Sequence, residues 1–468
     1  MPTATAAAST SDLHDPNSAA YKKARRRHLK AARSRQHAEH ETDWTPFRAA
    51  EKKYKARFPP PDLSDVLDLA TLNTSRAEEV LRGAWHGRAD AVAYREIELN
   101  GDNDAGPSTG RRAYIFPDIP GLVLLPSFVD PEGQRRLVRW ALCEQACHPN
   151  ETNLDTHYVL PESGLWNKYI RIRKEECEDE SVQPRAALYS SPTESAAAEA
   201  PGPRRLVSNE PASKENYDTL SSTPKPPAAP SPSVQPLRVS ALVPRLRWAN
   251  IGWSYHWGTK QYDFSKGKGT IDQGVRSVCK RAVRAVRWDR VFEDDNSTAG
   301  DWGEDGPDWD SWHETYEPDA GIVNFYQTKD TLMAHVDRSE VCATSPLVSV
   351  SYVLDLVPGH LNLSAESDSL GCAAVFLIGG LTREVKPTAI LLRSGDAVIM
   401  SGPACRRAYH GVPRVLEGTL PPHLESGTDG DWAVYEEYLR NSRINVNVRQ
   451  VFQRGFDPTA PTRHAGDT

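Results

Sequence analysis

Short apolar segments in the second half of this 468-residue chain constrain its fold more than any other feature. They are rich in β-branched and aromatic residues, and turns such as Gly379-Gly380 and Ser394-Gly395 separate them, which is the pattern of β-strands. Many short strands with glycine turns predict a mainly β fold with flanking helices, in which antiparallel sheets close into a double-stranded β-helix, or jelly-roll. The segments span residues 246–255, 320–326, 347–354, 374–378, 389–392, 397–400 and 444–448.

Changes in composition divide the chain around this core. Residues 1–113 are predicted to form an N-terminal extension, with a disordered basic arm and helical segments, and the ordered domain is predicted to span 114–456. Pro, Ser, Ala and Glu dominate residues 175–240. Such a stretch cannot bury enough apolar area to offset the entropy of ordering, so it is predicted to be a disordered insertion. A second insertion is predicted at 355–369 and a disordered tail at 457–468.

The net charge of −7 gives no global signal for nucleic acid, so any such contact must be local. The dense basic run at 22–35 is either a solvated arm or a patch for nuclear import or an RNA backbone. The basic stretch 266–290 either contacts phosphates or is a helix packed through Val278, Val283 and Val286. The acidic stretch 293–319 is predicted to be a surface loop.

Cysteine usage and hydropathy bear on the cellular compartment. The seven cysteines form no C-x-x-C pair, which favours reduced thiols in an intracellular protein over a disulfide framework. No run of 18 apolar residues exists, so no membrane span is predicted. The nucleus or cytoplasm is favoured over the mitochondrion, and no sequence feature indicates an oligomeric state.

Two histidines and one aspartate give the strongest chemical signal. His335 and Asp337 stand two residues apart, and in an extended segment such residues point to one face, so they can reach one ion together. His410 follows a predicted strand and a Ser-Gly-Pro turn, which suits a third ligand from a neighbouring strand. Two imidazoles and one carboxylate are the facial set that holds non-haem Fe(II) and leaves positions open for a co-substrate and dioxygen.

Two arginines follow this triad in the last predicted strand. Arg443 and Arg449 share one face with Asn445 and Asn447, because their separations are even. Two interpretations stay open. The four polar residues face solvent, or they line a polar barrel interior, where a buried arginine needs an anionic partner such as the distal carboxylate of 2-oxoglutarate.

Six segments around these residues resemble the AlkB family of Fe(II)/2-oxoglutarate dioxygenases and occur in the family's order. Residues 149–155 and 246–262 resemble in particular the subgroup of the first mammalian member. The resemblance covers roughly 114–174 and 242–456. The six segments are Asn324-Phe-Tyr, His335-Val-Asp-Arg-Ser-Glu, Pro346-Leu-Val-Ser-Val-Ser, Val375-Phe-Leu-Ile-Gly-Gly-Leu, Ser394-Gly-Asp-Ala-Val-Ile-Met-Ser-Gly and Arg443-Ile-Asn-Val-Asn-Val-Arg-Gln.

The resemblance implies an iron site and a co-substrate site at the positions that match the family's motifs. His335, Asp337 and His410 would bind Fe(II), and dioxygen would be consumed with 2-oxoglutarate. Arg449 matches a second family arginine that lies near the co-substrate and the metal. The residues that would hold or support 2-oxoglutarate are Asn324, Tyr326, Arg443 and Asn445.

An aromatic run before the metal motif is predicted to bind the substrate. An alternating strand buries one face, so about half of the run should belong to the core, while Trp257 and Tyr262 are predicted to lie in a loop. Ser339 stands where the family's bacterial enzyme has an aspartate near the alkylated base, so that enzyme's substrate preference cannot be copied. The substrate candidates are Trp248, Trp253, Tyr255, Trp257, Tyr262, Arg338 and Ser339.

The family's chemistry implies oxidative demethylation, in which 2-oxoglutarate becomes succinate and an N-methyl group leaves as formaldehyde. A methylated base must be unstacked to reach such a site, and an aromatic face attracts the cationic N1-methyladenine. Nucleic acid is the predicted partner, with N1-methyladenine in tRNA favoured and N-methyladenine in DNA second. Two alternatives stay open: a protein demethylase or hydroxylase, for example of histones, with the same site, and a non-catalytic binding module.

Overall fold

Antiparallel sheets form the centre of the computed structural model, which describes residues 13–35, 44–100, 112–189, 210–294, 299–303, 306–350, 371–453, 455–456 and 458. The larger sheet contains β1 (Arg95–Glu98), β2 (Arg112–Ile115), β3 (Leu122–Leu125), β6 (Trp248–His256), β7 (Gln261–Lys268), β8 (Ala320–Gln327), β10 (Leu347–Val350), β13 (Ala397–Met400) and β15 (Ser442–Arg449). The smaller sheet contains β9 (Leu332–His335), β11 (Ala374–Ile378), β12 (Thr388–Leu392) and β14 (His410–Val415). A separate pair consists of β4 (Ser181–Val182) and β5 (Leu237–Arg238).

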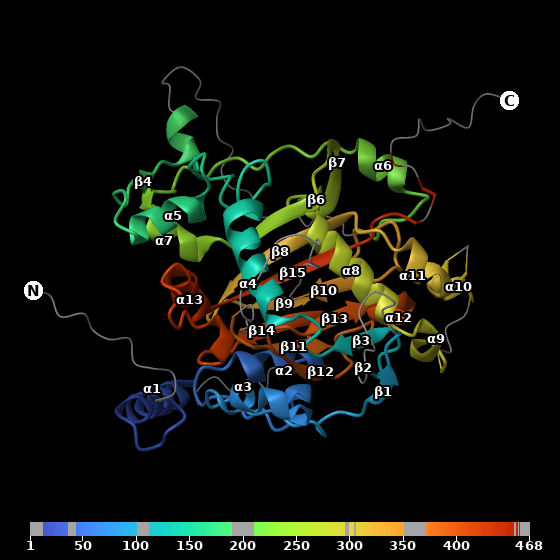
Figure 1. The fold of residues 1–468 in the computed structure, drawn as a ribbon, viewed down its shortest axis with the longest axis horizontal. Coiled ribbons are helices and arrows are strands. Elements are labelled where there is room, and N and C mark those ends of the chain that lie inside the picture. Colours follow the sequence, from blue (N-terminus) through green and yellow to red (C-terminus); the bar gives the residue numbers. More distant parts are fainter. Residues whose placement is uncertain are drawn as a thin grey trace, which may run out of the picture.

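The helices surround these sheets (Figure 1). They are α1 (Ala19–Arg35), α2 (Pro46–Lys55), α3 (Ala77–Leu81), α4 (Pro131–Arg139), α5 (Leu165–Arg173), α6 (Tyr217–Ser222), α7 (Val239–Leu242), α8 (Gln273–Ala285), α9 (Trp288–Val291), α10 (Ala299–Trp302), α11 (Trp312–Thr315), α12 (Gly402–Arg406) and α13 (Ala433–Leu439). Shorter helical turns are η2 (Leu69–Leu72), η3 (Thr74–Arg76), η4 (Trp140–Gln145), η5 (Arg185–Tyr189), η6 (Val243–Arg245), η7 (Trp309–Ser311) and η8 (Pro422–Leu424). Among the described residues, no helix is both long and apolar enough to cross a membrane.

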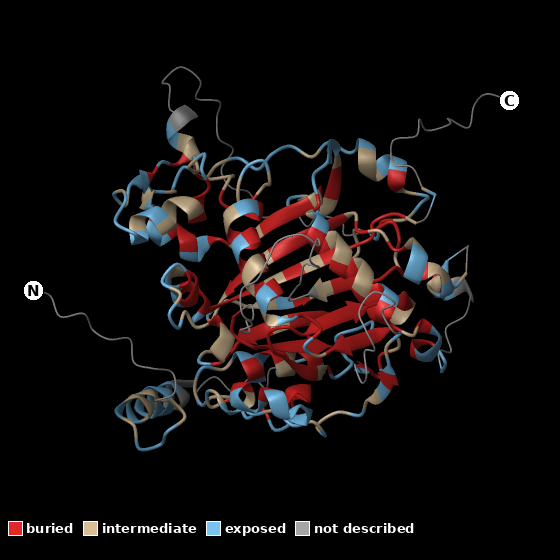
Figure 2. Cartoon of the chain, viewed as in Figure 1, coloured by how far each residue is buried: buried red, intermediate tan, exposed pale blue. Residues whose placement is uncertain are grey.

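The strand order confirms the mainly β fold with flanking helices. The nine-stranded sheet runs β1-β2-β3-β13-β10-β15-β8-β6-β7, and the four-stranded sheet runs β12-β11-β14-β9. Every strand pairing in the two sheets is antiparallel. Most residues along these strands are buried, whereas the described part of α1 is largely exposed (Figure 2). The buried surfaces of the two sheets therefore form the core that positions the site.

Helices cover the outer face of each sheet. Helix α8 begins after Asp272, whose side chain accepts hydrogen bonds from the backbone N–H groups of Gly274 and Val275. Its buried Val278 and Val283 pack in the same cluster as Phe325 of β8 and Ile444 of β15. This result favours the helix interpretation of the basic stretch 266–290. On the other side of the molecule, α2 packs against the smaller sheet through residues of one apolar cluster that include Phe47, Val375 and Leu377.

The alternating pattern of strand β15 left open whether its polar face meets solvent or lines an interior, and the structure decides between the two. Ile444, Val446 and Val448 are buried in the apolar cluster beneath α4 and α8. The opposite face carries Arg443, Asn445, Asn447 and Arg449, and all four line a cavity rather than bulk solvent. The two neighbours of β15 are β8 and β10, so it is a central strand covered on both faces. The four polar residues therefore line an interior.

The ordered core begins earlier than the expected boundary near residue 114. Strand β1 pairs with β2, and Phe47 is fully buried against the smaller sheet. Leu67 is also fully buried, and its backbone N–H donates to the carbonyl of Ala389 in β12. Residues 44–98 therefore belong to the same packed body as the sheets. The basic run at 22–35, expected as a disordered arm, lies within helix α1, which contacts this body through Tyr21 on Phe58.

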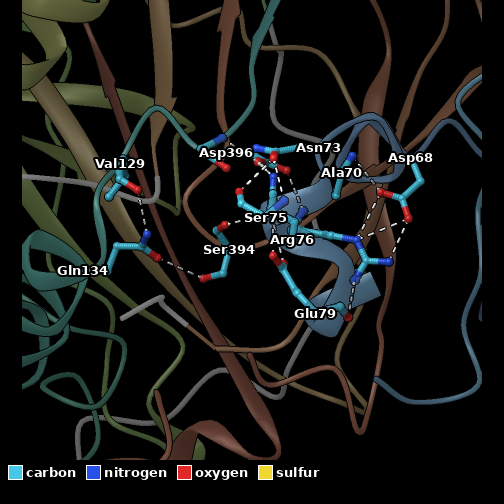
Figure 3. Close-up of polar contacts among 12 residues, drawn as sticks. Asp68, Ala70, Asn73, Ser75, Arg76, Glu79, Val129, Gln134, Ser394 and Asp396 are labelled. Atoms are coloured by element: carbon cyan, nitrogen blue, oxygen red, sulfur yellow. Dashed lines mark hydrogen bonds and ion pairs between the residues drawn. The ribbon is translucent and has the colours of Figure 1, made fainter. Parts of the chain in front are cut away.

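Buried ion pairs attach this N-terminal part to the turn between β12 and β13. Arg393 donates two hydrogen bonds to Asp68 from Nε and one, 2.7 Å long, from Nη2 to Oδ2, and both side chains are fully buried. Arg76 forms ion pairs with Glu79 at 2.8 Å and with Asp396 at 2.7 Å (Figure 3). A charge buried without its partner costs several kcal/mol, so these pairs hold the segment in one position.

The backbone of the turn between β12 and β13 requires a glycine at position 395. Gly395 has a φ of +81°, in the left-handed region that favours glycine, and a Cβ there would lie 2.7 Å from Nε2 of Gln134. Gln134 lies in α4, which begins at Pro131 and is capped by the side chain of Asp130, accepting from the N–H of Gly133. The turn predicted at Ser394-Gly395 is thus confirmed, and it links α4 to the network in Figure 3.

The predicted disorder of residues 175–240 does not extend to the described parts of this range. Val182 of β4 pairs with Leu237 of β5 and closes the neck of the insertion. Tyr217 of α6 is buried against Phe264 of β7. Composition averaged over the whole stretch hides these few apolar anchors, which is why the expectation failed here. Residues 190–209 lie outside the described residues, as do the predicted insertion at 355–369 and most of the tail at 457–468.

The acidic stretch 293–319 is not a simple surface loop. Trp302 and Trp312 are buried and pack with Trp288 and Phe292. The ring centroids of Trp288 and Trp312 are 5.0 Å apart, and those of Phe292 and Trp302 are 5.1 Å apart. Burial of these tryptophans stabilises the packed conformation of the stretch in spite of its many acidic residues. Glu317 also pairs with Arg276 and Lys280 of α8, which brings acidic and basic stretches together.

Replacing Arg393 with methionine tests the role of the buried pair. Arg393→Met keeps side-chain volume but leaves the carboxylate of Asp68 buried without its cation, which should lower the free energy of unfolding by about 3–5 kcal/mol. Chemical denaturation followed by circular dichroism measures the change. Arg88→Met is the matched control, because its pair with Asp90 is exposed and its removal should leave stability unchanged. Equal stability of both variants would show that residues 44–98 are held by other contacts.

Candidate metal and co-substrate site

A cavity of about 540 Å³ lies between the two sheets. The larger sheet contributes residues of β8, β10, β13 and β15, and the smaller sheet contributes residues of β9, β11, β12 and β14. The tip of the β6–β7 hairpin forms part of its wall through Tyr255, Trp257 and Lys260. His335, Asp337 and His410 lie together at this cavity, as the sequence predicted.

The three predicted metal ligands converge on one point. One ligand atom from each of His335, Asp337 and His410 lies within 4.8 Å of the other two, and no other group of three or more His, Cys, Asp or Glu among the described residues is this close. His335 ends β9 and His410 begins β14, and the two are register partners. Their ring centroids are 4.4 Å apart. Antiparallel pairing therefore brings together two ligands that are distant in sequence.

Backbone carbonyls orient both imidazoles. Nδ1 of His335 lies 3.0 Å from the carbonyl oxygen of Met333, and Nδ1 of His410 lies 3.1 Å from that of Ala408. Since a carbonyl only accepts, each Nδ1 carries the hydrogen and donates it. Nε2 of each ring then keeps a free lone pair, which is the usual arrangement of a metal-binding histidine.

The charge states of the triad suit a cation. Burial, with a further contribution from His335, lowers the pKa of His410 to about 4, so its imidazole is neutral at pH 7. Burial alone would raise the pKa of Asp337, but the positive charge of Arg449 is the largest opposing contribution, and that pKa lies well below its usual range. Two imidazoles and one carboxylate are the donor set of non-haem Fe(II) sites, so these residues fit that ion.

Beside the triad, Arg443 provides a buried positive charge. The side chain is 5 % exposed, and its Nη1 donates to the carbonyl oxygens of Cys372 at 3.1 Å and Leu392 at 3.2 Å. No carboxylate of the described residues forms an ion pair with it. Burial lowers the pKa of Arg443 below its ordinary value. A buried guanidinium held only by carbonyls fits an anionic ligand in the same cavity.

The other predicted co-substrate residues surround this guanidinium. Asn324 and Tyr326 of β8 are register partners of Asn445 and Arg443 of β15, and all four line the cavity. The buried hydroxyl of Tyr326 has no hydrogen-bond partner among the described residues. Asn445 is held by Ser349, whose hydroxyl donates to its Oδ1 at 3.1 Å. An uncommitted hydroxyl beside a buried cation fits a dicarboxylate such as 2-oxoglutarate.

Glu340 is a site residue that the sequence analysis missed. It is buried, and its carboxylate accepts from Arg449 Nη1 at 3.0 Å, from Arg406 Nη2 at 3.2 Å and from the Tyr262 hydroxyl at 3.0 Å. Arg449 Nη1 also lies 3.4 Å from Oδ2 of Asp337. Burial alone would raise the pKa of Glu340, but Arg449 and Arg406 hold it below its usual value. Glu340 therefore positions the arginine beside the metal ligand. Its place three residues after Asp337 was the available sequence signal.

The structure separates the substrate candidates into two groups. Tyr255, Trp257, Arg338 and Ser339 line the cavity, and Trp257 is 46 % exposed. Trp248 packs against Trp257 in a tilted arrangement, with ring centroids 5.2 Å apart, but is not part of the cavity wall.

Two of the predicted substrate residues are core residues instead. Trp253 and Tyr262 are buried in an apolar cluster behind the hairpin, and neither lines the cavity. The placement of Tyr262 in a loop is wrong, because it pairs with Tyr255 inside the β6–β7 ladder. The hydroxyl of Ser339 donates to the carbonyl of Lys260 at 3.0 Å, so this candidate is committed to the hairpin. Lys260, Met333 and Arg383 line the cavity without having been predicted.

Comparison with known proteins agrees with this geometry. A profile of the 2OG-Fe(II) oxygenase superfamily matches residues 205–353 and 363–449, slightly more than half of the chain. The "tRNA demethylase abh1" of Schizosaccharomyces pombe is 28% identical over 414 residues, which cover 86% of this chain and 95% of that protein. The "Nucleic acid dioxygenase ALKBH1" of Mus musculus is 26% identical, with 85% and 81% covered. The "N6-methyladenosine RNA demethylase ALKBH" of Cryphonectria parasitica is 30% identical, with 54% and 96% covered.

The chain belongs to the 2OG-Fe(II) oxygenase superfamily and, within it, to the AlkB family. Enzymes of this superfamily use Fe(II), 2-oxoglutarate and dioxygen, which confirms the cofactor and co-substrates predicted from the sequence.

Replacing Arg443 tests the co-substrate site. Arg443→Met should weaken 2-oxoglutarate binding at least about 30-fold, because truncating one partner of a buried charge pair costs about 2–5 kcal/mol. Isothermal titration of 2-oxoglutarate into Mn(II)-loaded protein measures the loss. Arg414→Met is the control, because Arg414 is also buried but is paired with Glu417, so its affinity for 2-oxoglutarate should match the wild type. A similar loss in both variants would contradict a specific role for Arg443.

Proposed function

We propose that this protein is an Fe(II)/2-oxoglutarate-dependent oxidative demethylase of N-methylated bases in nucleic acid, with N1-methyladenine in tRNA as the favoured substrate and DNA as the second. The observation that carries the proposal is the convergence of His335, Asp337 and His410 beside Arg443 in a cavity whose mouth holds aromatic residues. The cavity would then combine a site for a redox metal, a site for an anion and aromatic surfaces on which a base can stack.

The names of the relatives support nucleic acid as the substrate class. Besides the tRNA demethylase of Schizosaccharomyces pombe, they include a "DNA N(6)-methyladenine demethylase ALKBH1A" of Arabidopsis thaliana, 25% identical over 433 residues, and RNA demethylases of two fungi. Each of these names describes a demethylase of nucleic acid, and they differ in the kind of nucleic acid. This variety is why the proposal ranks tRNA first without excluding DNA.

The residues around the cavity divide the work of the reaction. His335, Asp337 and His410 would hold Fe(II), while Arg443, Tyr326, Asn324 and Asn445 would hold 2-oxoglutarate. When bound, iron and 2-oxoglutarate supply dioxygen chemistry that converts 2-oxoglutarate to succinate and carbon dioxide and hydroxylates the N-methyl group, which then leaves as formaldehyde. Arg449 keeps Asp337 ionised, and the carbonyls of Met333 and Ala408 accept from Nδ1 of the two histidines, so Nε2 of each would be available to hold the ion.

The mouth of the cavity suits an unstacked cationic base. Tyr255 and Trp257 meet edge to face, with ring centroids 4.9 Å apart, and both line the cavity. N1-methyladenine carries a positive charge, which aromatic faces attract, and stacking on such faces is worth about 1–3 kcal/mol per base. A base in a duplex or stem must be flipped out to reach the iron, because the metal site lies between the two sheets.

The two sheets support a more detailed description of the fold. We propose that they are the two halves of a jelly-roll core, because they face each other across the cavity and share an apolar cluster that includes Leu122, Leu347, Phe376 and Leu392. The domain proposed for catalysis extends over residues 44–456, because residues 44–98 pack on the sheets through buried ion pairs.

Helix α1 is proposed to bind the phosphate backbone. Its described basic side chains are exposed, and none forms an ion pair among the described residues. Cations on one short helix attract nucleic acid through counterion release even where the whole protein is acidic. The exposed basic residues are Lys22, Lys23, Arg25, Arg26, Arg27 and Lys30.

Purified protein tests the reaction directly. With Fe(II), 2-oxoglutarate and tRNA that contains N1-methyladenine, it should release formaldehyde and leave unmodified adenine, measured by mass spectrometry of nucleosides. Asp337→Ala should abolish turnover, because it removes the only carboxylate of the triad. If the wild-type protein binds both cofactors but leaves tRNA, DNA and single-stranded RNA unchanged, the proposed substrate class is wrong.

Neutralising α1 tests the role of its charge. Changing Lys22, Lys23, Arg25 and Arg26 to Gln should weaken tRNA binding and lower the slope of log Kd against log salt by about 0.7–0.9 for each phosphate that the helix no longer neutralises. Fluorescence anisotropy at several salt concentrations gives both quantities. The control changes four basic residues that are already ion-paired, Arg88, Arg171, Lys174 and Arg287, to Gln. Equal slopes for the two variants would remove α1 from the binding surface.

A further inference from the structure

The described part of the insertion contacts the hairpin that forms the mouth of the cavity. Helix α6 lies beside β7 (Figure 1). Its Tyr217 is 8 % exposed, and the ring centroid of this residue lies 5.4 Å from that of Phe264 in β7. The same ring lies 4.9 Å from Phe456 and 5.7 Å from Phe452, and its hydroxyl donates to the carbonyl of Pro458. Aromatic pairs of this kind stabilise a contact beyond the effect of their buried area. Tyr217 therefore fixes the insertion to the back of β7.

A second contact joins the insertion to the tip of the hairpin. Nδ1 of His256 accepts from the backbone N–H of Thr259 at 3.2 Å, so the hydrogen of the ring is on Nε2. Nε2 lies 2.9 Å from the carbonyl oxygen of Pro226 and donates to it. His256 thus connects residue 226 to the turn at 257–260, which places Trp257 and Lys260 in the cavity wall.

A third contact reaches the segment that follows the metal ligand Asp337. The backbone N–H of Ala212 donates to the carbonyl of Arg338 at 2.8 Å. The next residue, Ser339, donates from its hydroxyl to the carbonyl of Lys260 at the hairpin tip. The insertion, the hairpin tip and the segment after Asp337 are therefore connected in one closed set of hydrogen bonds.

The insertion touches the parts of the wall that face the substrate and none that face the co-substrate. No residue of 210–226 lines the cavity. Its contacts are with the hairpin, which carries Tyr255 and Trp257, and with the backbone of Arg338, which also lines the cavity. The apolar cluster of Ala212 and Tyr217 includes Ala320, the first residue of β8, whereas Asn324 and Arg443 belong to the cavity wall. A change in the insertion should therefore act on the binding of nucleic acid and leave the binding of 2-oxoglutarate intact.

We propose that residues 210–226, here called the strap, position the β6–β7 hairpin and Arg338 for the target base. Tyr217 of the strap and His256 of β6 are the positioning residues, and neither touches the base. The inference rests on the proposed nucleic-acid demethylase function, since it assigns to the strap the geometry of that substrate's binding wall. Displacement of a binding group by about 1 Å through a distant mutation can cost up to about a hundredfold in rate.

Tyr217→Ala in the full-length holoenzyme tests the strap. The KM for a single-stranded oligonucleotide that contains N1-methyladenine should rise about tenfold, within the range expected for a displaced binding wall. Substrate-free turnover of 2-oxoglutarate and its KM should stay unchanged. Tyr217→Phe, which keeps the ring contacts, should restore the wild-type KM. Tyr94→Ala is the matched control, because Tyr94 packs on Tyr114 in the N-terminal part of the larger sheet, away from the hairpin.

A second variant covers the case in which Tyr217→Ala fails to fold. His256→Ala removes only the bond to Pro226 and the contacts within the tip, and it should weaken binding of the same oligonucleotide to the full-length Mn(II)-loaded protein, measured by anisotropy. His256→Gln, which can donate to Pro226, should recover part of the affinity.

The outcomes separate this inference from the proposed function. If the wild-type enzyme demethylates the oligonucleotide and the variants have unchanged KM and affinity, the positioning role of the strap is wrong and the proposed function still holds. A parallel fall in nucleic-acid turnover and in substrate-free 2-oxoglutarate turnover shows a merely structural role and also overturns it. A wild-type enzyme inactive on every nucleic acid overturns the proposed function, and with it the substrate assigned to the strap.

Discussion

Charge buried between the two sheets constrains the rest of this structure. Asp337 and Glu340 share the guanidinium of Arg449, while Arg443 rests on two backbone carbonyls. Both arginines lie on β15, whose other face is apolar core. A slip of one residue in the pairing of β15 would place both guanidiniums in that core and put Ile444 into the site. The register of the central strands and the chemistry of the cavity therefore depend on the same compensation of charge.

Features of the site that depend on neighbouring residues could be predicted from the sequence, whereas features that depend on the arrangement of distant strands could not. The spacing of His335 and Asp337 was informative because a two-residue step in extended chain has one geometric outcome. The polar face of β15 was not decidable from its own pattern, since alternation looks the same for a solvent-facing strand and for a strand that lines a cavity. The position of β15 between β8 and β10 made the difference, and strand order is a property of the whole chain.

Long-range contacts explain what the sequence could not show. Glu340 is buried because Arg406 and Arg449, 66 and 109 residues away, reach it. Tyr262 lies near glycines and lysines and was expected in a loop, but the hairpin register turns its hydroxyl toward Glu340. Composition correctly marked 175–240 as poor in apolar residues, yet one tyrosine in an aromatic pocket is enough to order the strap locally. Averages over long windows conceal such single anchors.

The strap and the ion pairs of the N-terminal part stabilise opposite ends of the molecule by different physics. Arg393 and Asp68 are fully buried, so the loss of either side chain would leave the charge of the other without compensation. The strap relies on aromatic packing and on three hydrogen bonds to backbone carbonyls or from backbone N–H groups, and such contacts can be remade after a displacement. The wall that faces the substrate is therefore held by contacts that are more easily remade than the buried ion pairs that hold residues 44–98.

The setting of Arg443 has a consequence for how much folded protein exists. A dicarboxylate that pairs with this guanidinium binds the folded chain and has no comparable site in the unfolded one. By mass action, a ligand at a hundred times its dissociation constant adds about 2.7 kcal/mol to the free energy of unfolding. The concentration of a central metabolite would then set the resistance of the protein to proteolysis as well as its turnover, and starvation for the keto acid would shorten its lifetime.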